Sequence, residues 1–388
     1  MGELVEIGDI DHRMPETVAD GIPYLMTGDF VGTNELNFDG TKMISEEDYC
    51  QLSQKIKPEK GDILFARYAS VGAARYVDFT RKFLISYSCA IIKKSKKINS
   101  KYLYHFITSG KVQQQIKLEI NTGSQANIGI DSMKNHIVVS MPPLEEQTKI
   151  ADALSNLDHL ITLHQRKYEK LVNIKKSMLD KMFPKNGASV PEIRFKGFTD
   201  LWEQRKLGEI AKEVVRNDPA SDAPIMMITA GNGFIEQSDR YAFNNAGESL
   251  KKYILLECGE LAYNHGASKL RPYGSCFALT TVEKARIPFV YHCFSVEKSN
   301  PEFLSIELNG ANVENQLRKI VSSGARMDGL LNIAYSEYTE VTVQLPKKEE
   351  QDWIAKFFKH LDTLITLHQR KLEKLQNIKK SCLEKMFV

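Results

Sequence analysis

The chain has 388 residues, enough for two or three domains, and its 42 % hydrophobic and 26 % charged residues are ordinary for a globular protein. No apolar run approaches the roughly 20 residues that a membrane-spanning helix needs, and the opening MGELVEIGDIDHR lacks the pattern of a signal peptide. Six scattered cysteines without a Cys-x-x-Cys pair argue against a disulfide framework and favour a reducing cytoplasm. A net charge of +3 excludes a strongly polycationic protein.

Residues 1–143 predict a mixed α/β domain. Apolar, β-branched and aromatic residues form strand-like runs in GDILFARYASVGAARYVDF, FLISYSCAIIKK and HIVVSM. A helical spacing covers Asn99–Ile120, with Asn99 or Ser100 as the N-cap, and a polar loop, NTGSQANIG, follows it.

Residues 144–183 predict one long amphipathic helix. Proline at the entry and acidic residues in the first turn are typical of a helix start. The core positions repeat with heptad spacing, as in a coiled coil, and at 1.5 Å per residue the helix would be about 57 Å long. The predicted seam residues are Ile150, Leu154, Leu157, Ile161 and His164.

The same order of elements recurs after a connector at 184–205. Residues 206–345 predict a second α/β domain, with strand-like GELAYNHG and IPFVYHCFSV, a helix over Asn300–Val321 and a polar loop, SSGARMDGLLN. Residues 346–388 predict the second long helix. Its predicted seam residues are Ile354, Phe358, Leu361, Ile365 and His368.

The two helical segments are copies of one another. Glu145–Phe183 and Glu349–Phe387 are identical at 27 of 39 positions without a gap, and both contain LITLHQRK. The domains before them match far less, which indicates one scaffold that carries two different surfaces. Two such helices in one chain are expected to pair with each other, antiparallel. The predicted fold class is therefore α+β, with two mixed α/β domains separated by two long antiparallel coiled-coil helices in a pseudo-two-fold tandem repeat.

His164 and His368 invite a metal-binding or catalytic interpretation. A polar residue at a heptad seam more often fixes the register of the helices, so a structural role is the preferred prediction.

The motifs indicate a binding protein rather than an enzyme. The sequence has no P-loop, no zinc-ligand spacing and no nucleophile elbow, and ITAGNGF lacks the third glycine of a dinucleotide fingerprint and predicts a turn. The expectation is that the chain holds no catalytic residue and no metal.

The candidate nucleic-acid contacts lie on loops that occupy matching positions in the two halves. Arg, Lys, Asn and Ser on glycine-containing loops suit base edges and phosphates, although ordinary loop polarity would give the same composition. The Lys93–Lys97 run could equally be a solvated strand end. The candidates are Arg67, Tyr68, Ser70, Arg75, Lys93, Lys94, Ser124, Gln125 and Asn127 in the first domain, and Asn264, His265, Ser268, Lys269, Arg271, Arg326 and Asn332 in the second.

The basic excess is confined to the repeated segments. Residues 1–144 carry 17 basic and 17 acidic side chains, and residues 201–344 carry 15 and 18, whereas 145–200 carry 10 and 8 and 345–388 carry 10 and 6. Because phosphate affinity requires Lys and Arg at the contact surface, binding of nucleic acid by either domain would need local patches or the charge of a partner.

The layout and the helices resemble the specificity (S) subunits of type I restriction–modification systems. The resemblance rests on PPLEEQTKIADALSNLDHLITLHQRKYEKLVNIKKSML and its copy, on GDILFARYASVG, and on the lead-in FKGFTDLWEQRKLGEIA. The lead-in precedes only the second domain, so the first strand of the first domain is expected to be short or its start truncated.

The resemblance implies two target recognition domains, each of which reads one half of a split, asymmetric site in double-stranded DNA. It implies helices that set the gap and dock two copies of a methyltransferase subunit, with motor–nuclease subunits added for cleavage. S-adenosylmethionine, ATP and Mg would be bound by those partners, and the complex would lie with the bacterial nucleoid in the cytoplasm.

Two alternatives stay open on the residues alone. One is a coiled-coil adaptor that joins two protein partners without nucleic acid, and the other is a nuclease or methyltransferase with an unrecognised site. The recognised bases do not follow from the loop residues.

Overall fold

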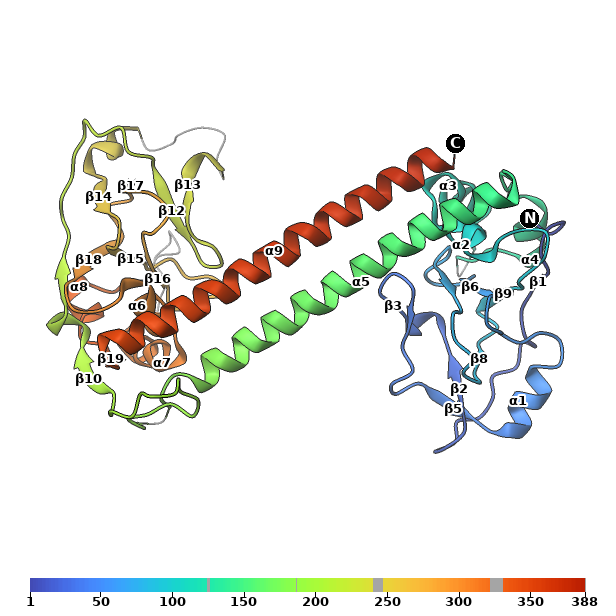
Figure 1. The fold of residues 1–388 in the computed structure, drawn as a ribbon, viewed down its shortest axis with the longest axis horizontal. Helices are drawn as coiled ribbons and strands as arrows, with labels where there is room; N and C mark the ends of the chain where they lie inside the picture. Colours follow the sequence, from blue (N-terminus) through green and yellow to red (C-terminus); the bar gives the residue numbers. More distant parts are fainter. Residues whose placement is uncertain (124–125, 186, 240–246, 322–330, 388) are drawn as a thin grey trace. The chain divides into compact units, whose positions relative to one another are not determined.

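The computed structural model describes residues 1–123, 126–185, 187–239, 247–321 and 331–387, and Figure 1 labels its elements. The chain forms two compact units. Unit 1 comprises Met1–Tyr168 and Leu367–Val388, and unit 2 comprises Glu169–Thr366. Each unit holds one α/β domain together with part of each long helix. Across the described residues, none of the helices is long and apolar enough to cross a membrane.

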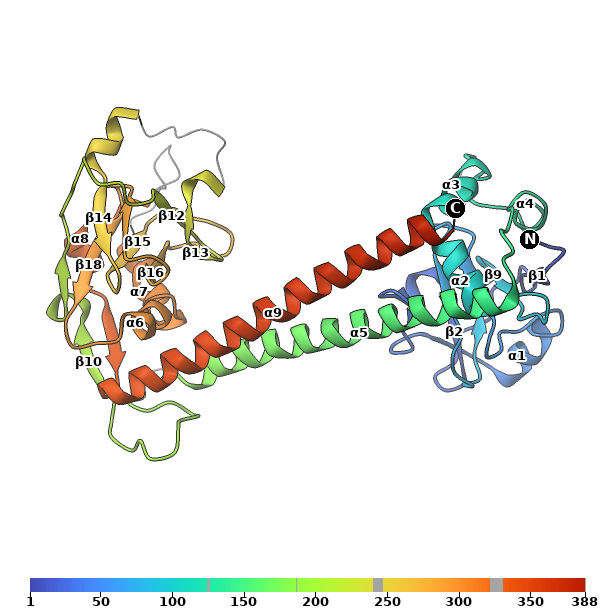
Figure 2. The ribbon, with the colours of Figure 1, turned by 45° about the horizontal axis from the view of Figure 1, so that its top comes forward.

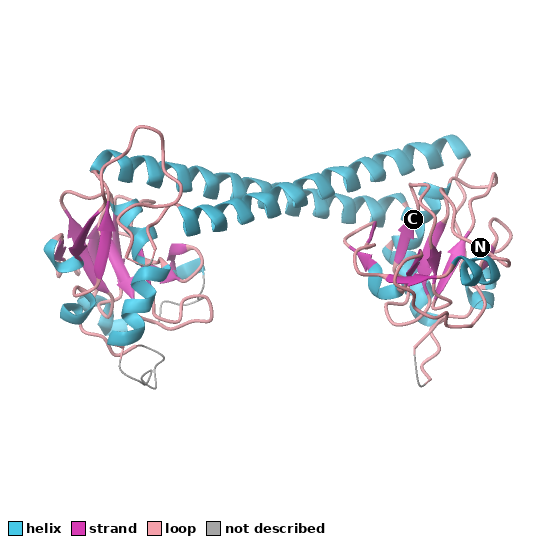
Figure 3. Ribbon diagram, turned by 90° about the horizontal axis from the view of Figure 1, so that it is seen from below, coloured by secondary structure: helices cyan, strands magenta, loops and turns pink. Residues whose placement is uncertain are grey.

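The domain of unit 1 is built on a four-stranded antiparallel sheet in the order β1-β9-β6-β7. A three-stranded sheet, β5-β2-β8, and a small hairpin, β3-β4, complete it, and Figure 3 shows the strands gathered into sheets in each domain. The strands are β1 Ile7–Gly8, β2 Ile22–Leu25, β3 Phe30–Val31, β4 Glu35–Leu36, β5 Lys42–Ile44, β6 Ile63–Ala66, β7 Ala74–Tyr76, β8 Leu84–Ile85 and β9 Cys89–Ile92.

The helix predicted over Asn99–Ile120 is in fact two helices. Asn99 caps the first by accepting a hydrogen bond from the Tyr102 N–H at 3.1 Å, as predicted. Ser109 then adopts an extended conformation (ψ 151°), which ends the first helix before Gly110 starts the next. The short helices of unit 1 are α1 Glu46–Leu52, α2 Ser100–Thr108, α3 Gly110–Leu118 and α4 Ile130–Asn135.

Unit 2 repeats the strand order of the main sheet with a different sequence, whereas its smaller sheets differ from those of unit 1. Its main sheet has the order β11-β18-β15-β16, and three two-stranded sheets, β10-β19, β12-β13 and β14-β17, surround it. The predicted helix Asn300–Val321 is again split in two, and the predicted turn in ITAGNGF joins β12 to β13. The strands are β10 Glu203–Lys206, β11 Ala211–Glu213, β12 Met226–Thr229, β13 Gly233–Glu236, β14 Ile254–Glu257, β15 Leu261–Asn264, β16 Ser275–Ala278, β17 Lys284–Ile287, β18 His292–Val296 and β19 Thr342–Leu345, and the helices are α6 Pro301–Leu308, α7 Ala311–Ile320 and α8 Tyr335–Tyr338.

The two long helices are α5, Leu144–Lys181, and α9, Lys348–Met386. All ten predicted seam residues are buried or half-buried. The seam is not purely a two-helix contact, however. Leu154 packs in the core of unit 1 together with residues of α2, and Ile354 and Phe358 pack in the core of unit 2 with residues of α6. The early part of each long helix therefore also serves as a wall of its own domain.

Within unit 1, the two helices run antiparallel. Nδ1 of His164 lies 2.8 Å from Nδ1 of His368, and the Asp158 carboxylate pairs with the Lys379 ammonium. Unit 2 contains the matching pair from the other copy of the repeat, Lys175 with Asp362. The pair explains why a lysine stands at a heptad position of the repeat: its ammonium has a carboxylate on the facing helix.

Each long helix is followed within two residues by an aromatic residue that packs against a domain. Phe387 lies 5.4 Å, between ring centroids, from both Tyr102 and Phe106 of α2, and Figure 2 shows the end of α9 beside α2. Its counterpart in unit 2 is Phe183, which packs against Trp202 and Phe303. Buried aromatic contacts of this kind stabilise both helix ends.

Candidate nucleic-acid interface

In unit 1 the candidate loop joins β6 to β7 across residues 67–73. The N–H of Ala73 donates to the Ser70 carbonyl at 3.0 Å, so the loop is a tight turn. Ala69 has a positive φ of 58°, which is unusual for a residue other than glycine. Ala69 and Ser70 are exposed and Tyr68 is half-buried. The tip of this loop is therefore available to a ligand.

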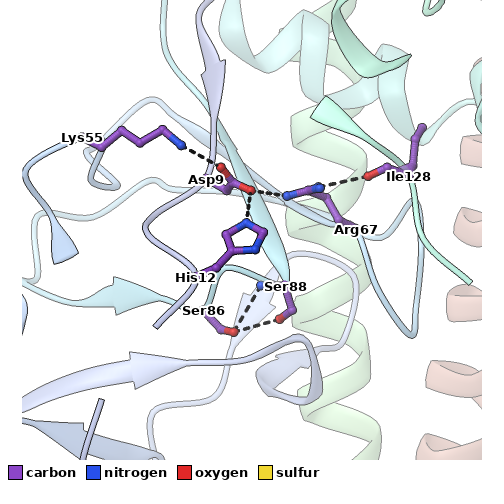
Figure 4. Close-up of polar contacts among 7 residues, drawn as sticks. All are labelled: Asp9, His12, Lys55, Arg67, Ser86, Ser88 and Ile128. Carbon is purple, nitrogen blue, oxygen red and sulfur yellow. Dashed lines mark hydrogen bonds and ion pairs between the residues drawn. The ribbon is translucent and has the colours of Figure 1, made fainter. Parts of the chain in front are cut away.

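Arg67, at the start of the loop, points inward instead. Its Nη1 pairs with the Asp9 carboxylate, and its Nε donates to the Ile128 carbonyl at 3.0 Å (Figure 4). The backbone carbonyl of Arg67 accepts the Ile128 N–H at 3.1 Å. The residue thus fastens the loop to Ile128 by both its side chain and its backbone.

Asp9 stays charged in this buried place. Burial is the largest influence on its carboxyl and would by itself raise the pKa, but hydrogen bonds from His12 and Lys55 and the charge of Arg67 lower the pKa below its usual value. His12 lies 3.0 Å and Lys55 3.1 Å from the carboxylate, and both are largely exposed (Figure 4). Arg67 is thus an internal partner of Asp9 rather than a free cation.

Arg75 is also committed within the domain. Its guanidinium donates to backbone carbonyls at Glu35 (3.1 Å), Ala74 (2.7 Å) and Gly32 (3.0 Å), and it lies over the Phe30 ring. These contacts attach the β3-β4 hairpin to the main sheet. Burial lowers the pKa of the guanidinium. The group nevertheless stays charged at any working pH, because the pKa of an arginine lies far above neutrality.

Lys93 and Lys94 do not lie beside this loop. In the β6–β9 pair, Ile63 is opposite Ile92 and Ala66 is opposite Cys89, so Lys93 follows the end of the ladder that is remote from Arg67. The two ends of this ladder, at Ile63 and at Ala66, lie about 10 Å apart. The Lys93 ammonium lies 2.6 Å from the buried Asp62 carboxylate, whereas Lys94 is exposed.

Unit 2 builds its loop in the same way with other residues. His265 follows β15, its backbone carbonyl accepts the Leu331 N–H at 2.9 Å, and its Nδ1 lies 2.8 Å from the Leu331 carbonyl. Its Nε2 lies 2.6 Å from the Val290 carbonyl. His265 and Leu331 therefore correspond to Arg67 and Ile128. We call these two arrangements the loop clamps.

The other candidates in unit 2 divide into inward and outward side chains. Asn264 donates to the Ile228 carbonyl at 3.1 Å, and half-buried Arg271 donates to the Asn309 carbonyl at 2.6 Å. Ser268 and Lys269 are exposed at the loop tip. Asn332 is exposed next to the clamp.

Three candidates, Ser124, Gln125 and Arg326, lie outside the described residues. Asn127 is half-buried and forms a β-bridge with Tyr68, which brings it to the loop after β6. The structure thus gathers a set of exposed or half-buried polar side chains in each domain, which we call the loop-tip set. The set consists of Tyr68, Ser70 and Asn127 in unit 1 and of Ser268, Lys269 and Asn332 in unit 2.

Sequence reasoning did not find the partners of the clamps. Asp9 lies 58 positions before Arg67 and Ile128 lies 61 after it, so no local spacing joins them. An aspartate just before the apolar Ile10, in the strand-like segment LVEIGDI, was the available signal, since a buried aspartate requires a partner. Among the described residues, no group of three or more His, Cys, Asp and Glu side chains is placed to hold a metal ion.

The fold and the paired loops define a class of protein: a tandem repeat of two α/β domains whose main sheets share one strand order. The chain belongs to the family of type I restriction modification DNA specificity domains, which matches residues 1–173 and 199–377.

Similar proteins agree with this membership. A protein of Methanocaldococcus jannaschii, provisionally named the MjaX specificity subunit of a type I restriction enzyme, is 25 % identical over 345 residues, which cover 82 % of this chain and 76 % of that protein. The EcoKI specificity subunit of Escherichia coli is 22 % identical over 372 residues, covering 90 % and 79 %. The crystal structure of a type I S subunit from M. genitalium shares the fold, with a TM-score of 0.62 at 15 % identity, over all of this chain and 94 % of that one.

Proposed function

We propose that each domain of this specificity subunit reads one half of a bipartite, asymmetric DNA site. The observation that carries the proposal is the pair of loop clamps, which hold two loops in the same way while their exposed side chains differ. One scaffold with two different loop tips is what recognition of two different half-sites requires.

The residues of the loop-tip set suit contacts in the major groove. Ser and Asn side chains hydrogen-bond base edges, Lys269 can contact guanine or a phosphate, and the ring of Tyr68 can pack against the sugar–phosphate backbone. Arg67 and His265 act by positioning these loops. Because the two domains carry no excess of basic residues, we expect partner subunits to supply much of the phosphate contact, so the chain alone should bind DNA weakly.

We further propose that α5 and α9 set the gap between the half-sites and dock two methyltransferase subunits. Repetition of LITLHQRK in both helices supports this, since like surfaces can receive identical partners. Adenine methylation with S-adenosylmethionine, and DNA cleavage with ATP and Mg by motor–nuclease subunits, would then take place in the partners and not in this chain. The complex would work on DNA in the bacterial cytoplasm.

Single-molecule sequencing of methylated adenine tests the proposal, in a host that carries this chain and its methyltransferase. The expected result is one split motif, and exchange of residues 1–143 for the first domain of another family member should alter only one half of it. Alteration of both halves would contradict modular reading. Absence of any sequence-selective retention on DNA in the presence of the methyltransferase would favour the protein adaptor, and methyl transfer or cutting by the chain alone would favour an enzyme.

A further inference from the structure

The loop that follows β15 in unit 2 carries a large apolar side chain at its tip. Leu270 is 65 % exposed and stands between Lys269 and Arg271 in the sequence. Single exposed apolar residues are common on protein surfaces, so exposure alone indicates no role. The position of Leu270 is what distinguishes it, because it belongs to the loop that the proposed function assigns to contact with DNA.

The turn that presents Leu270 is closed by two hydrogen bonds. The Ser268 N–H donates to the Arg271 carbonyl at 3.0 Å, and the Arg271 N–H donates to Ser268 Oγ at 3.0 Å. Lys269 and Leu270 therefore form a two-residue tip. The Arg271 guanidinium donates to the Asn309 carbonyl at 2.6 Å, which fastens the base of the turn to the residue that follows α6. Leu270 is thus held in place before a ligand arrives, so binding has little chain left to order.

The turn between β12 and β13 lies against one side of Leu270. A Cβ built on Gly231 would stand 3.8 Å from Leu270 Cδ2. This second turn is fixed as well, because Thr229 Oγ1 accepts the Asn232 N–H at 3.3 Å and donates to the Gly233 carbonyl at 3.3 Å. Asn232 is exposed. An apolar group therefore stands at a place where two polar turns of unit 2 meet.

The equivalent loop of unit 1 presents no such group. Across residues 67–73, all of which the structure describes, the exposed residues are Ala69 and Ser70, and Val71 is half-buried. A large exposed apolar side chain at the loop tip is therefore a feature of unit 2 that unit 1 does not share.

We propose that Leu270 packs against the C5-methyl group of a thymine in the major groove and so selects a T·A pair in the half-site of unit 2. The inference rests on the proposed function and deepens it by naming one contact. Thymine presents a methyl group in the major groove, and its contact with an apolar side chain removes both from water. Cytosine at the same place would present its amino group to Leu270, which has no acceptor, so this donor would lose its hydrogen bond to water.

The test begins from the methylated motif. Sequencing of methylated adenine gives the motif, and exchange of residues 1–143 shows which half belongs to unit 2. Duplexes with this motif are then prepared in which each thymine of that half is replaced in turn by uracil, a change that removes only the methyl group. Fluorescence anisotropy, with the chain in complex with its methyltransferase, should show about fourfold weaker binding for one replacement, the loss expected when one methyl group is no longer buried.

Variants of Leu270 connect this loss to the side chain. Leu270→Ala should weaken binding of the thymine duplex and remove most of the difference between thymine and uracil, because the partner of the methyl group is gone. Leu270→Met keeps an apolar side chain and should keep the difference, whereas Leu270→Asn, similar in size but polar, should lose it. Leu118→Ala is the matched control at a leucine of unit 1 that is 86 % exposed, and it should leave the ratio of the two affinities unchanged.

Two results would overturn the proposal and leave the proposed function standing. One is a half-site of unit 2 that contains no A·T pair. The other is a ratio of thymine to uracil affinity that is the same in the parent chain and in Leu270→Ala, which would assign the leucine to a contact with a partner subunit or to a wedge between base pairs. Absence of a split motif would instead refute the proposed function, and this inference with it.

Discussion

Arg67 and His265 show how one structural task is met by two unlike side chains. Each follows one of the two central strands of its main sheet, and each holds an apolar residue that is distant in the sequence, Ile128 or Leu331, by one backbone and one side-chain hydrogen bond. The arginine requires a counter-charge, which Asp9 supplies, whereas the histidine uses a second carbonyl at Val290. The clamp is retained although the chemistry around it changes.

Replacement of Arg67 by methionine should destabilise unit 1 by about 3 kcal/mol, because it leaves the buried Asp9 carboxylate without its principal charge partner. Urea denaturation at pH 7 measures the change, and Lys96→Met, at an exposed lysine, should cost less than about 0.5 kcal/mol. The pKa of Asp9 is lowered in the folded state, so this contribution is present at neutral pH and is lost as pH falls through the folded pKa. An Arg67→Met effect that persists unchanged below that pH would contradict the assignment.

Glu307, on α6, is a buried carboxyl with the opposite behaviour. Burial is the main cause that raises its pKa to about 7, although the Gln344 N–H and the Asn312 side chain lower it. The folded state therefore retains a proton that the unfolded state has released, and the free energy of unfolding falls as pH rises from about 4.5 to about 7.

Glu307→Gln should accordingly raise the melting temperature at pH 8, with a gain in stability on the order of 1–3 kcal/mol, and have little effect at pH 4.5. Thermal unfolding at the two pH values measures this. Glu349→Gln, at an exposed carboxylate in the same unit, serves as the control. Equal pH dependence of the Glu307 variant and the parent chain would disprove the raised pKa.

Residue type predicted the location of the candidate loops better than it predicted the direction of their side chains. Arginine and histidine are residue types that often contact DNA, yet Arg67, Arg75 and His265 are buried. Their hydrogen-bond partners lie far away in the sequence, so the sequence pattern did not reveal this burial. Ser70 and Lys269, by contrast, are exposed at the loop tips. A single sequence carries the periodicity of elements, but not the long-range pairing that decides which polar group faces inward.

At the scale of elements, the heptad pattern predicted the two long helices because it is a local signal. It did not reveal that the first part of each seam also faces a domain, nor that Ser109 divides a predicted helix in two. At one heptad position of each helix a lysine, Lys175 or Lys379, replaces the expected apolar residue. These two lysines form the ion pairs Lys379–Asp158 and Lys175–Asp362.

These two ion pairs can be compared directly, because they are equivalent pairs of the repeat that differ in their exposure to solvent. The Asp158–Lys379 pair is 14 % and 12 % exposed, whereas Asp362 and Lys175 are 53 % and 32 % exposed. Burial raises the pKa of Asp158 although Lys379 opposes it, so the charge there depends on its partner. Asp158→Asn leaves the Lys379 ammonium, which is 12 % exposed, without its carboxylate and should destabilise the chain by about 1–3 kcal/mol. Asp362→Asn, at the more exposed pair, should cost less than about 1 kcal/mol.

Exchange of the charges, Asp158→Lys with Lys379→Asp, should recover most of the stability lost by either single change. A double-mutant cycle of urea denaturation measures the coupling. Additive effects of the two substitutions would mean that the pair does not hold the antiparallel register.

At the scale of the whole molecule, the proposed function links the length of the two long helices to the gap between the two DNA half-sites. The ion pairs and the His164–His368 contact indicate where residues can be added without loss of register: between His164 and Lys175 on α5, and between Asp362 and His368 on α9. A heptad inserted at each place keeps the seam in phase and leaves the contacts of each unit intact.

Matched seven-residue insertions after Tyr168 and after Thr366 lengthen each helix by about 10 Å, close to three base pairs of DNA. The methylated motif should therefore keep both half-sites and gain about three base pairs in its gap. Sequencing of methylated adenine in cells that carry the variant and its methyltransferase measures the gap. A four-residue insertion in one helix alone makes the comparison sharper, because it shifts the seam and should lower stability as well as change the gap. A motif with an unchanged gap in the matched variant would show that the helices do not set the spacing.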